Sequence, residues 1–151
     1  MRQLERLLPA GNVILDLDVT SKKRVFEHAG LLFENTLGIS RSTIFDALLA
    51  RERLGSTGLG HGVAIPHGRV KGSQHVQASF IRLKKPLPFD AVDGQPVDLL
   101  FCLAVPEDCG EDHLKLLAQV AELFSDPELL QKLRDADSAG RLLQLLSGAA
   151  H

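Results

Sequence analysis

Residues 97–105 read Val-Asp-Leu-Leu-Phe-Cys-Leu-Ala-Val, and this nearly unbroken apolar run is the strongest constraint that the sequence places on the fold. Such a run predicts a strand that is buried on both faces, because a strand with one solvated face would alternate between apolar and polar residues. A strand of this kind needs helices on both sides of its sheet. The run is also far too short to cross a bilayer.

The rest of the chain shows short apolar runs and segments with apolar residues at helical spacing. Strands are expected at 13–15, 63–65 and 78–83. Helices are expected between a cap at Thr20 or Ser21 and Gly38, from Ser40 or Ser42 onward, and after the capping residues Asp112, Asp126 and Ser138. The order of these elements predicts an α/β fold, a mixed β-sheet flanked by helices on both faces. No repeat or linker divides the chain, so residues 1–151 are expected to form a single domain with a core over about 10–147.

Composition and charge exclude several classes of protein. Apolar residues make up 44% and charged residues 24% of the chain, which argues against global disorder. A net charge of -2 without a basic stripe argues against nucleic-acid binding. Cys102 and Cys109 form no CxxC pair and no secretory signal precedes them, so we expect a reducing, cytoplasmic location and no membrane insertion. Burial of Cys102 in the apolar strand is the simplest account of that thiol, and any redox role of the two cysteines stays open.

Residues 60–69, written GHGVAIPHGR, place two histidines in a frame of glycines and proline. Pro66 favours an extended conformation for the residue before it and fixes its own φ, while Gly68 allows an immediate turn. The imidazole of His67 is therefore expected at a strand end on a rigid stem, where α/β folds often place their chemistry. The alternative is a structural histidine, which is the more common case for a lone imidazole.

A glycine-rich segment, residues 55–62, lies just before this histidine. It matches neither the Walker loop nor the GxGxxG pattern. One interpretation is a tight connection that needs positive φ angles. The other is a backbone that presents N–H groups to an anion beside His67.

His113 is expected in the first turn of a helix, on the face that carries Leu117, Val120 and Phe124. It is either a hydrogen-bonded side chain at the edge of the core or a group close to an anion at the helix N-terminus. His61, His67 and His113 are too widely spaced for a metal motif and no HExxH pattern is present. We therefore expect neither a metal nor a cofactor.

A long ordered match links these residues. Glu52, Leu59, Gly60 and residues 63–68 together resemble the phosphohistidine signature of the mannitol/fructose-type enzyme IIA family of the bacterial phosphotransferase system. Residues 89–101 also agree, and the resemblance is greatest to the nitrogen-regulatory branch of that family. It covers roughly residues 10–147.

The resemblance implies a role for each candidate residue. His67 would be the phosphoryl acceptor, His113 a second active-site histidine, and Arg51 an arginine near the phosphoryl group. The loop that binds the phosphoryl group would include Ser56, Gly60, Gly62 and Gly68. These groups could stabilise phosphoryl transfer without a metal, since such transfer depends mainly on alignment and on charge stabilisation.

Two further expectations concern the surroundings of the acceptor. His61 stands where relatives commonly carry asparagine, and it would place a second imidazole near His67. Because the phosphoryl group passes between proteins, the site should be shallow and bordered by apolar surface. Leu59, Val63 and Ile65 are the candidates for part of that surface.

By resemblance, the leading hypothesis is a regulatory phosphocarrier with a phosphotransferase activity. Its donor would be a histidine-phosphorylated carrier protein, and its targets would be proteins such as potassium transporters or sensor kinases. One alternative is a sugar-transport enzyme IIA that passes phosphate to a IIB domain, which would be expected on a separate chain because residues 1–151 show no such domain. Another is a protein-interaction module whose histidines take no part in phosphoryl transfer.

Overall fold

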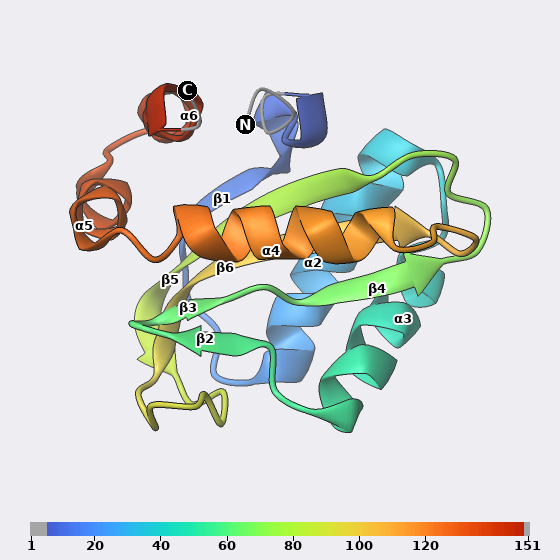
Figure 1. The fold of residues 1–151 in the computed structure, drawn as a ribbon, viewed down its shortest axis with the longest axis horizontal. Helices are drawn as coiled ribbons and strands as arrows, with labels where there is room; N and C mark the ends of the chain where they lie inside the picture. Colours follow the sequence, from blue (N-terminus) through green and yellow to red (C-terminus); the bar gives the residue numbers. More distant parts are fainter. Residues whose placement is uncertain (1–5, 150–151) are drawn as a thin grey trace.

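The computed structural model describes residues 6–149, which form one mixed, open sheet with helices on both faces (Figure 1). The six strands of this part of the chain are β1 (Val13–Leu17), β2 (Gly58–Gly60), β3 (Val63–Ala64), β4 (His67–Val70), β5 (Gln77–Leu87) and β6 (Val97–Pro106). The α-helices are α2 (Lys22–Leu37), α3 (Arg41–Leu54), α4 (Asp112–Leu123), α5 (Pro127–Asp135) and α6 (Ala139–Ala149), and a short 3-10 helix, η1 (Ala10–Asn12), precedes β1.

Strand β6 lies inside the sheet and is buried on both faces, which confirms the prediction from its apolar run. Leu99, Phe101 and Leu103 point into a core covered by α4, α5 and α6. Leu100 and Cys102 point into a second core covered by α2 and α3. Figure 1 shows α4 on one side of the sheet and α2 and α3 on the other. The expected fold class is therefore confirmed.

Both edges of β6 are hydrogen-bonded to other strands. Strand β5 pairs with it in antiparallel orientation, and β1 then pairs in parallel with β5. On the other edge, β3 and β4 both run parallel to β6, while β2 pairs in antiparallel orientation with β3. The strand order is β1-β5-β6-β3-β2, with β4 also against β6.

Several expected helix boundaries are confirmed by their caps. Ser21 Oγ accepts the backbone N–H of Arg24 at 3.2 Å, and Gly38 ends α2 in the left-handed conformation at φ 70. Asp126 caps α5. Ser138 accepts a backbone N–H from the first turn of α6.

One expected cap is wrong. Asp112 is the first residue of α4 and follows Glu111, whose side chain makes no capping hydrogen bond. An acidic side chain in the first helical turn is still favoured by the helix dipole, so the sequence signal was shifted by one residue.

The sequence also missed strand β4. Pro66 ends β3, as expected, because it has no N–H to donate to the ladder. Its carbonyl nevertheless accepts the backbone N–H of Leu103 at 2.8 Å, and His67 then pairs with Leu103. The chain therefore continues along β6, and His67 is the first residue of a strand rather than the residue that ends one.

No helix among the described residues is apolar over a length that would span a membrane. Cys102 and Cys109 are both free thiols. Burial raises the pKa of the Cys102 thiol to about 12, so this thiol stays protonated at neutral pH.

The C-terminal helices are tied to the sheet by Arg82 of β5, a buried side chain. Its Nη1 donates to the carbonyl oxygens of Leu133, Arg134 and Ala136 at 3.0, 3.1 and 2.6 Å. These carbonyls lie at the end of α5 and have no partner within the helix. On its other side the guanidinium binds both carboxylate oxygens of Asp16 at 3.1 Å.

We predict that Arg82→Leu lowers the free energy of unfolding by about 3 kcal/mol, because it leaves the carbonyls at the end of α5 without a donor. Asp16→Asn is the matched control. The Asp16 side chain is 64% exposed, so losing its charge should cost no more than about 1 kcal/mol. Urea denaturation measures both variants, and equal losses would contradict the role of the carbonyl contacts.

Candidate functional site

The His67 ring is oriented by a backbone hydrogen bond. Its Nδ1 lies 2.9 Å from the carbonyl oxygen of Ile65. A carbonyl oxygen can only accept, so Nδ1 carries the proton and donates it. The lone pair of the neutral ring is then on Nε2, and no described residue donates a hydrogen bond to this nitrogen. The arrangement leaves Nε2 available as a nucleophile.

His67 lines an open hollow of about 330 Å³ between the loop after α3 and the outer side of α4. The residues around it are Arg51, Ser56, Thr57, Gly58, Leu59, Ile65, His67, Leu117, Ala118 and Ala121. The hollow thus combines an imidazole, a guanidinium and two hydroxyl groups with an apolar wall.

Burial in this hollow lowers the pKa of His67 below its ordinary value of 6.5. The hydrogen bond to the Ile65 carbonyl opposes this shift, because it favours the protonated ring. The positive charges of Arg51 and His113 lower the pKa further, and the carboxylate of Glu52 raises it. Burial outweighs the opposing effects, so the ring is neutral at pH 7 and can act as a nucleophile.

Arg51 comes from the last turn of α3 and lines the hollow with His67. Its Nη1 donates to the carbonyl oxygen of Gly55 at 2.9 Å, which holds the side chain over the loop. This bond uses only part of a guanidinium that has five N–H donors. No residue in the described range 6–149 accepts from the remaining donors, so they can bind an anion in the hollow.

The loop itself is fixed by the buried carboxylate of Glu52. Its Oε1 accepts the Thr57 hydroxyl at 2.6 Å, and its Oε2 accepts the Thr57 N–H at 3.2 Å. Lys22 completes the arrangement with an ion pair to Oε2 at 3.0 Å. Ser56 Oγ accepts the Gly58 N–H at 3.0 Å and donates to the carbonyl of Phe89. The loop is therefore held rigidly beside His67.

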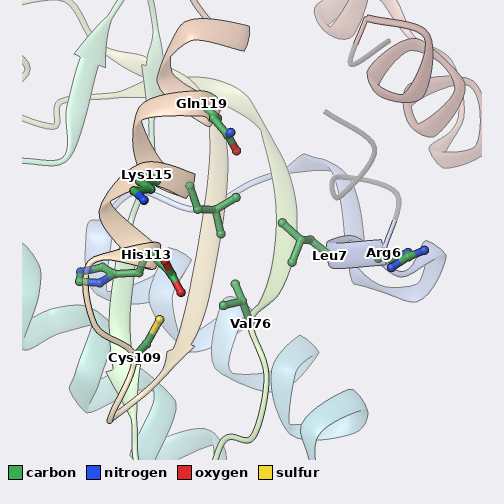
Figure 2. Close-up of a pocket in the computed structure, with 9 residues that line it drawn as sticks. Arg6, Leu7, Val76, Cys109, His113, Lys115 and Gln119 are labelled. Atoms are coloured by element: carbon green, nitrogen blue, oxygen red, sulfur yellow. The ribbon is translucent and has the colours of Figure 1, made fainter.

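His113 is half-buried in the first turn of α4, and its Nδ1 lies 2.6 Å from the carbonyl oxygen of Gly110. It also lines a second, larger hollow of about 540 Å³ on the other side of this turn. Figure 2 shows that the imidazole points away from Leu7 and Val76 of that hollow. The ring is near enough to His67 for its charge to affect the pKa of His67. Three sequence-predicted residues, Arg51, His67 and His113, are thus brought together.

The expected glycines of the loop are not all in one place. Gly60 is the last residue of β2 and Gly62 lies in the turn that follows, with φ angles of 100 and 81, and neither is among the residues that line the His67 hollow. Their position fits the alternative interpretation, a tight turn that needs positive φ. Gly68 lies in β4, where a Cβ would come within 2.8 Å of the backbone of Ala47 in α3. Its role in the fold is close packing.

His61 does not stand beside His67, so that expectation is wrong. It occupies the tip of the β2–β3 turn with φ 57 and lines a separate hollow with Asp93 and Arg134. Its N–H donates to Asp93 Oδ2 at 2.9 Å, and its carbonyl accepts from Arg134 at 2.7 Å. The positive φ at this position suits asparagine and histidine better than most residues.

The apolar border of the site also differs from the expectation. Leu59, 38% exposed, and Ile65, 4% exposed, both line the hollow as expected, but Val63 is 1% exposed, belongs to the core and does not line it. The wall is completed instead by Leu117, Ala118 and Ala121 of α4. The sequence pattern could not show this, because the outer side of α4 meets the loop only in the folded chain.

Within residues 6–149, no three histidine, cysteine, aspartate or glutamate side chains are grouped as a metal site would need. The chemistry that the site itself offers is nucleophilic attack by a neutral imidazole beside a fixed cation.

Comparisons with known proteins identify the family to which the chain belongs. Residues 6–149 match the family model described as phosphoenolpyruvate-dependent sugar phosphotransferase system, EIIA 2. The nitrogen regulatory protein of Pseudomonas aeruginosa is 44% identical over 147 residues, which cover 97% of this chain and 96% of that protein.

Two solved structures have the same fold. The crystal structure of the nitrogen regulatory protein IIA-Ntr from Neisseria meningitidis matches with a TM-score of 0.89 and 45% identity, over 95% of this chain and 98% of that one. The enzyme IIA of the Escherichia coli complex of IIAMtl with phosphorylated IIBMtl matches with a TM-score of 0.79 and 21% identity, over 94% and 99%. The second likeness concerns the fold alone.

We predict that His67 titrates below pH 6.5 in the folded protein, as read from the NMR shift of its Cε1–H. An unfolded chain then binds a proton at this position before the folded one does as the pH falls. The contribution of His67 to stability is therefore present above pH 6.5 and is lost on acidification. When the pH is lowered from about 7.5 to about 5.5, the free energy of unfolding should fall less in His67→Gln than in the wild type. A measured pKa at or above 6.5 would contradict the burial argument.

Proposed function

Because the chain belongs to the EIIA 2 family of the phosphoenolpyruvate-dependent sugar phosphotransferase system, we propose that it is a regulatory phosphocarrier with His67 as the phosphoryl acceptor. Members of this family are components of a phosphotransferase system, so a general role in phosphoryl transfer follows from membership. The acceptor, the donor and the regulated targets are parts of the proposal.

One observation carries the assignment of the acceptor. The hydrogen bond from Nδ1 to the Ile65 carbonyl fixes the tautomer in which Nε2 is the nucleophilic nitrogen. The other histidine near the hollow, His113, donates from its own Nδ1 to Gly110 but does not line the hollow that holds Arg51. His67 is thus the better placed nucleophile.

In the proposed step, the Nε2 lone pair of His67 attacks the phosphorus of a phosphohistidine on the donor protein. A new N–P bond forms as the donor N–P bond breaks, and the bonding electrons return to the donor imidazole. Nδ1 keeps its proton, so positive charge develops on the His67 ring during the transfer. The Ile65 carbonyl stabilises that charge, because its hydrogen bond favours the protonated ring.

The transferring phosphoryl group carries negative charge on its equatorial oxygens, and stabilising that charge is the main task of the surrounding groups. Arg51 has N–H donors at the hollow that no described residue accepts, and His113, in the first turn of α4, is near enough for its charge to act on His67. Ser56 lines the same hollow, in a loop that Glu52 holds in place.

Sequence similarity favours a regulatory role over a transport role. The nitrogen regulatory proteins compared above share 44% and 45% of their residues with this chain across nearly its whole length. The mannitol-specific relative shares 21%, and its likeness supports only the fold. In the proposed function a histidine-phosphorylated carrier protein is the donor, and the phosphorylation state of His67 controls binding to target proteins, such as potassium transporters or sensor kinases.

We predict that His67→Ala abolishes acid-labile labelling when the protein is incubated with phosphoenolpyruvate, enzyme I and a phosphocarrier protein. Arg51→Ala and His113→Ala should still accept phosphate, but about 10²- to 10³-fold more slowly, as is typical when one group that stabilises the transition state is lost. Circular dichroism checks that each variant is folded. Full labelling of His67→Ala would refute the acceptor assignment, and wild-type rates in both other variants would show that different groups build the site.

Phosphorylation would also act as a charge switch at the protein surface. The phosphoryl group adds about -1.5 to -2 charges, by analogy with phosphorylated hydroxyl residues. The group would lie beside the apolar wall of Leu59, Leu117 and Ala118. A partner that packs on this wall would have to desolvate the new charge or lose contact.

We therefore predict that the affinity of a regulated partner changes by roughly 5- to 150-fold between the two states, the range typical of coupling between sites. Calorimetric titration of the partner with unmodified protein, phosphorylated protein and His67→Asp measures the effect. Equal affinity for the two states with every partner found would reduce the protein to a phosphate shuttle.

A further inference from the structure

His67 and Arg69 extend from the same side of strand β4. Gly68 and Val70 are buried against α3 and α2. Since side chains alternate along a strand, His67 and Arg69 point to the opposite side, toward α4. Arg69 is therefore a cation on the same side as the acceptor ring and one pleat further along.

The Arg69 guanidinium is bound to the segment that leads into α4. Its Nη1 donates to the carbonyl oxygens of Glu107, at 3.0 Å, and Cys109. Its Nη2 lies 3.3 Å from Nδ1 and 3.5 Å from Nε2 of His113. One side chain thus holds both the loop and the imidazole at the start of the helix.

The His113 contacts fix the roles of the atoms. The Gly110 carbonyl at 2.6 Å can only accept, so His113 Nδ1 carries a proton and donates it. A protonated Nδ1 cannot also accept from Arg69, so the Arg69–Nδ1 distance is a packing contact and Nε2 is the ring atom open to an N–H of Arg69. The loop carbonyl on one side and the guanidinium on the other limit the rotation of the ring.

We propose that Arg69 is a positioning residue for phosphoryl transfer, which acts through His113 by holding the 107–110 loop and the imidazole in place. This inference rests on the proposed function of the His67 site. It also separates two arginines with different tasks. Among the described residues Arg51 has one bond to the loop and keeps its other donors free, whereas Nη1 of Arg69 donates to two carbonyls and its Nη2 is next to Nε2 of His113.

The planar fork of arginine is essential to this role. Nη1 donates to two carbonyls while Nη2 of the same rigid group reaches the imidazole, and a lysine ammonium cannot reproduce that geometry. Arg69→Lys should therefore behave like Arg69→Gln although it keeps the charge. A requirement for charge alone would instead be met by lysine.

The kinetic test is transfer from a histidine-phosphorylated carrier protein of the phosphotransferase system to the unmodified chain. Arg69→Gln should lower kcat by about 10- to 100-fold, by analogy with the loss of a group that orients a metal-binding histidine, with little change in KM. Lys71→Gln is the matched control, because it removes one exposed positive charge two residues further along the same segment. It should transfer at the wild-type rate.

A double-mutant cycle then shows whether Arg69 acts through His113. If it does, Arg69→Gln adds little to the loss in His113→Ala, because residues that act as a unit are not additive. Fully additive losses, or a wild-type rate in Arg69→Gln, would overturn the proposal. Restoration of the rate by Arg69→Lys would overturn it as well.

An NMR measurement tests whether Arg69 holds His113 in place, and it needs no phosphoryl donor protein. In the unmodified wild type, the ¹⁵N shifts of His113 should report a single tautomer with the proton on Nδ1, and Arg69→Gln should shift or broaden these signals. Unchanged His113 signals in Arg69→Gln would overturn the positioning role. If the wild type accepts no phosphate at all, the proposed function fails, and this measurement still tests the hold of Arg69 on His113.

Discussion

Burial of β6 on both faces is the constraint on which the rest of the structure depends. Its side chains alternate between two cores, so helices must cover the sheet on both sides. Both edges of β6 are also paired, with β5 on one side and with β3 and β4 on the other. Because β6 is fixed on every side, it provides a rigid reference for the segment that carries His67.

The site lies beside β6, at the point where Pro66 separates the neighbouring strands β3 and β4. Pro66 breaks the ladder between β3 and β4, and the Ile65 carbonyl, one residue earlier, turns to accept the proton of His67 Nδ1. The same register then places Arg69 toward α4. A single missing N–H thus lets one edge of the sheet present both an oriented nucleophile and a cation that holds the opposite helix.

The electrostatics of the site follow from partial burial. His67 is buried enough for the neutral ring to be favoured, yet it keeps a backbone acceptor that stabilises the ring when positive charge develops. The carboxylate of Glu52 is engaged by Thr57 and Lys22, so it holds the loop in place. Arg51 therefore supplies the positive charge that lines the hollow.

Local patterns in the sequence determined a large part of this protein. The apolar run predicted β6 and the helices on both faces of its sheet. Ser21 and Asp126 marked the starts of helices. The frame of Pro66 and Gly68 distinguished His67 from the other histidines. Each of these signals depends on neighbours in the chain, through backbone conformation or side-chain spacing.

Only the tertiary structure decided which distant groups meet. Strand β4 was missed because its partner is β6, and a proline predicts a break but not a continuation along a distant strand. The contacts of Arg69 with the loop before α4 join residues 38 and 40 positions apart, and the apolar wall of α4 meets Leu59 from even further along the chain. His61 and Gly62 are close to His67 in sequence, yet the tight β2–β3 turn directs them to another hollow. Spacing along the chain fixes what a residue can do locally, whereas packing of the sheet and helices fixes what it faces.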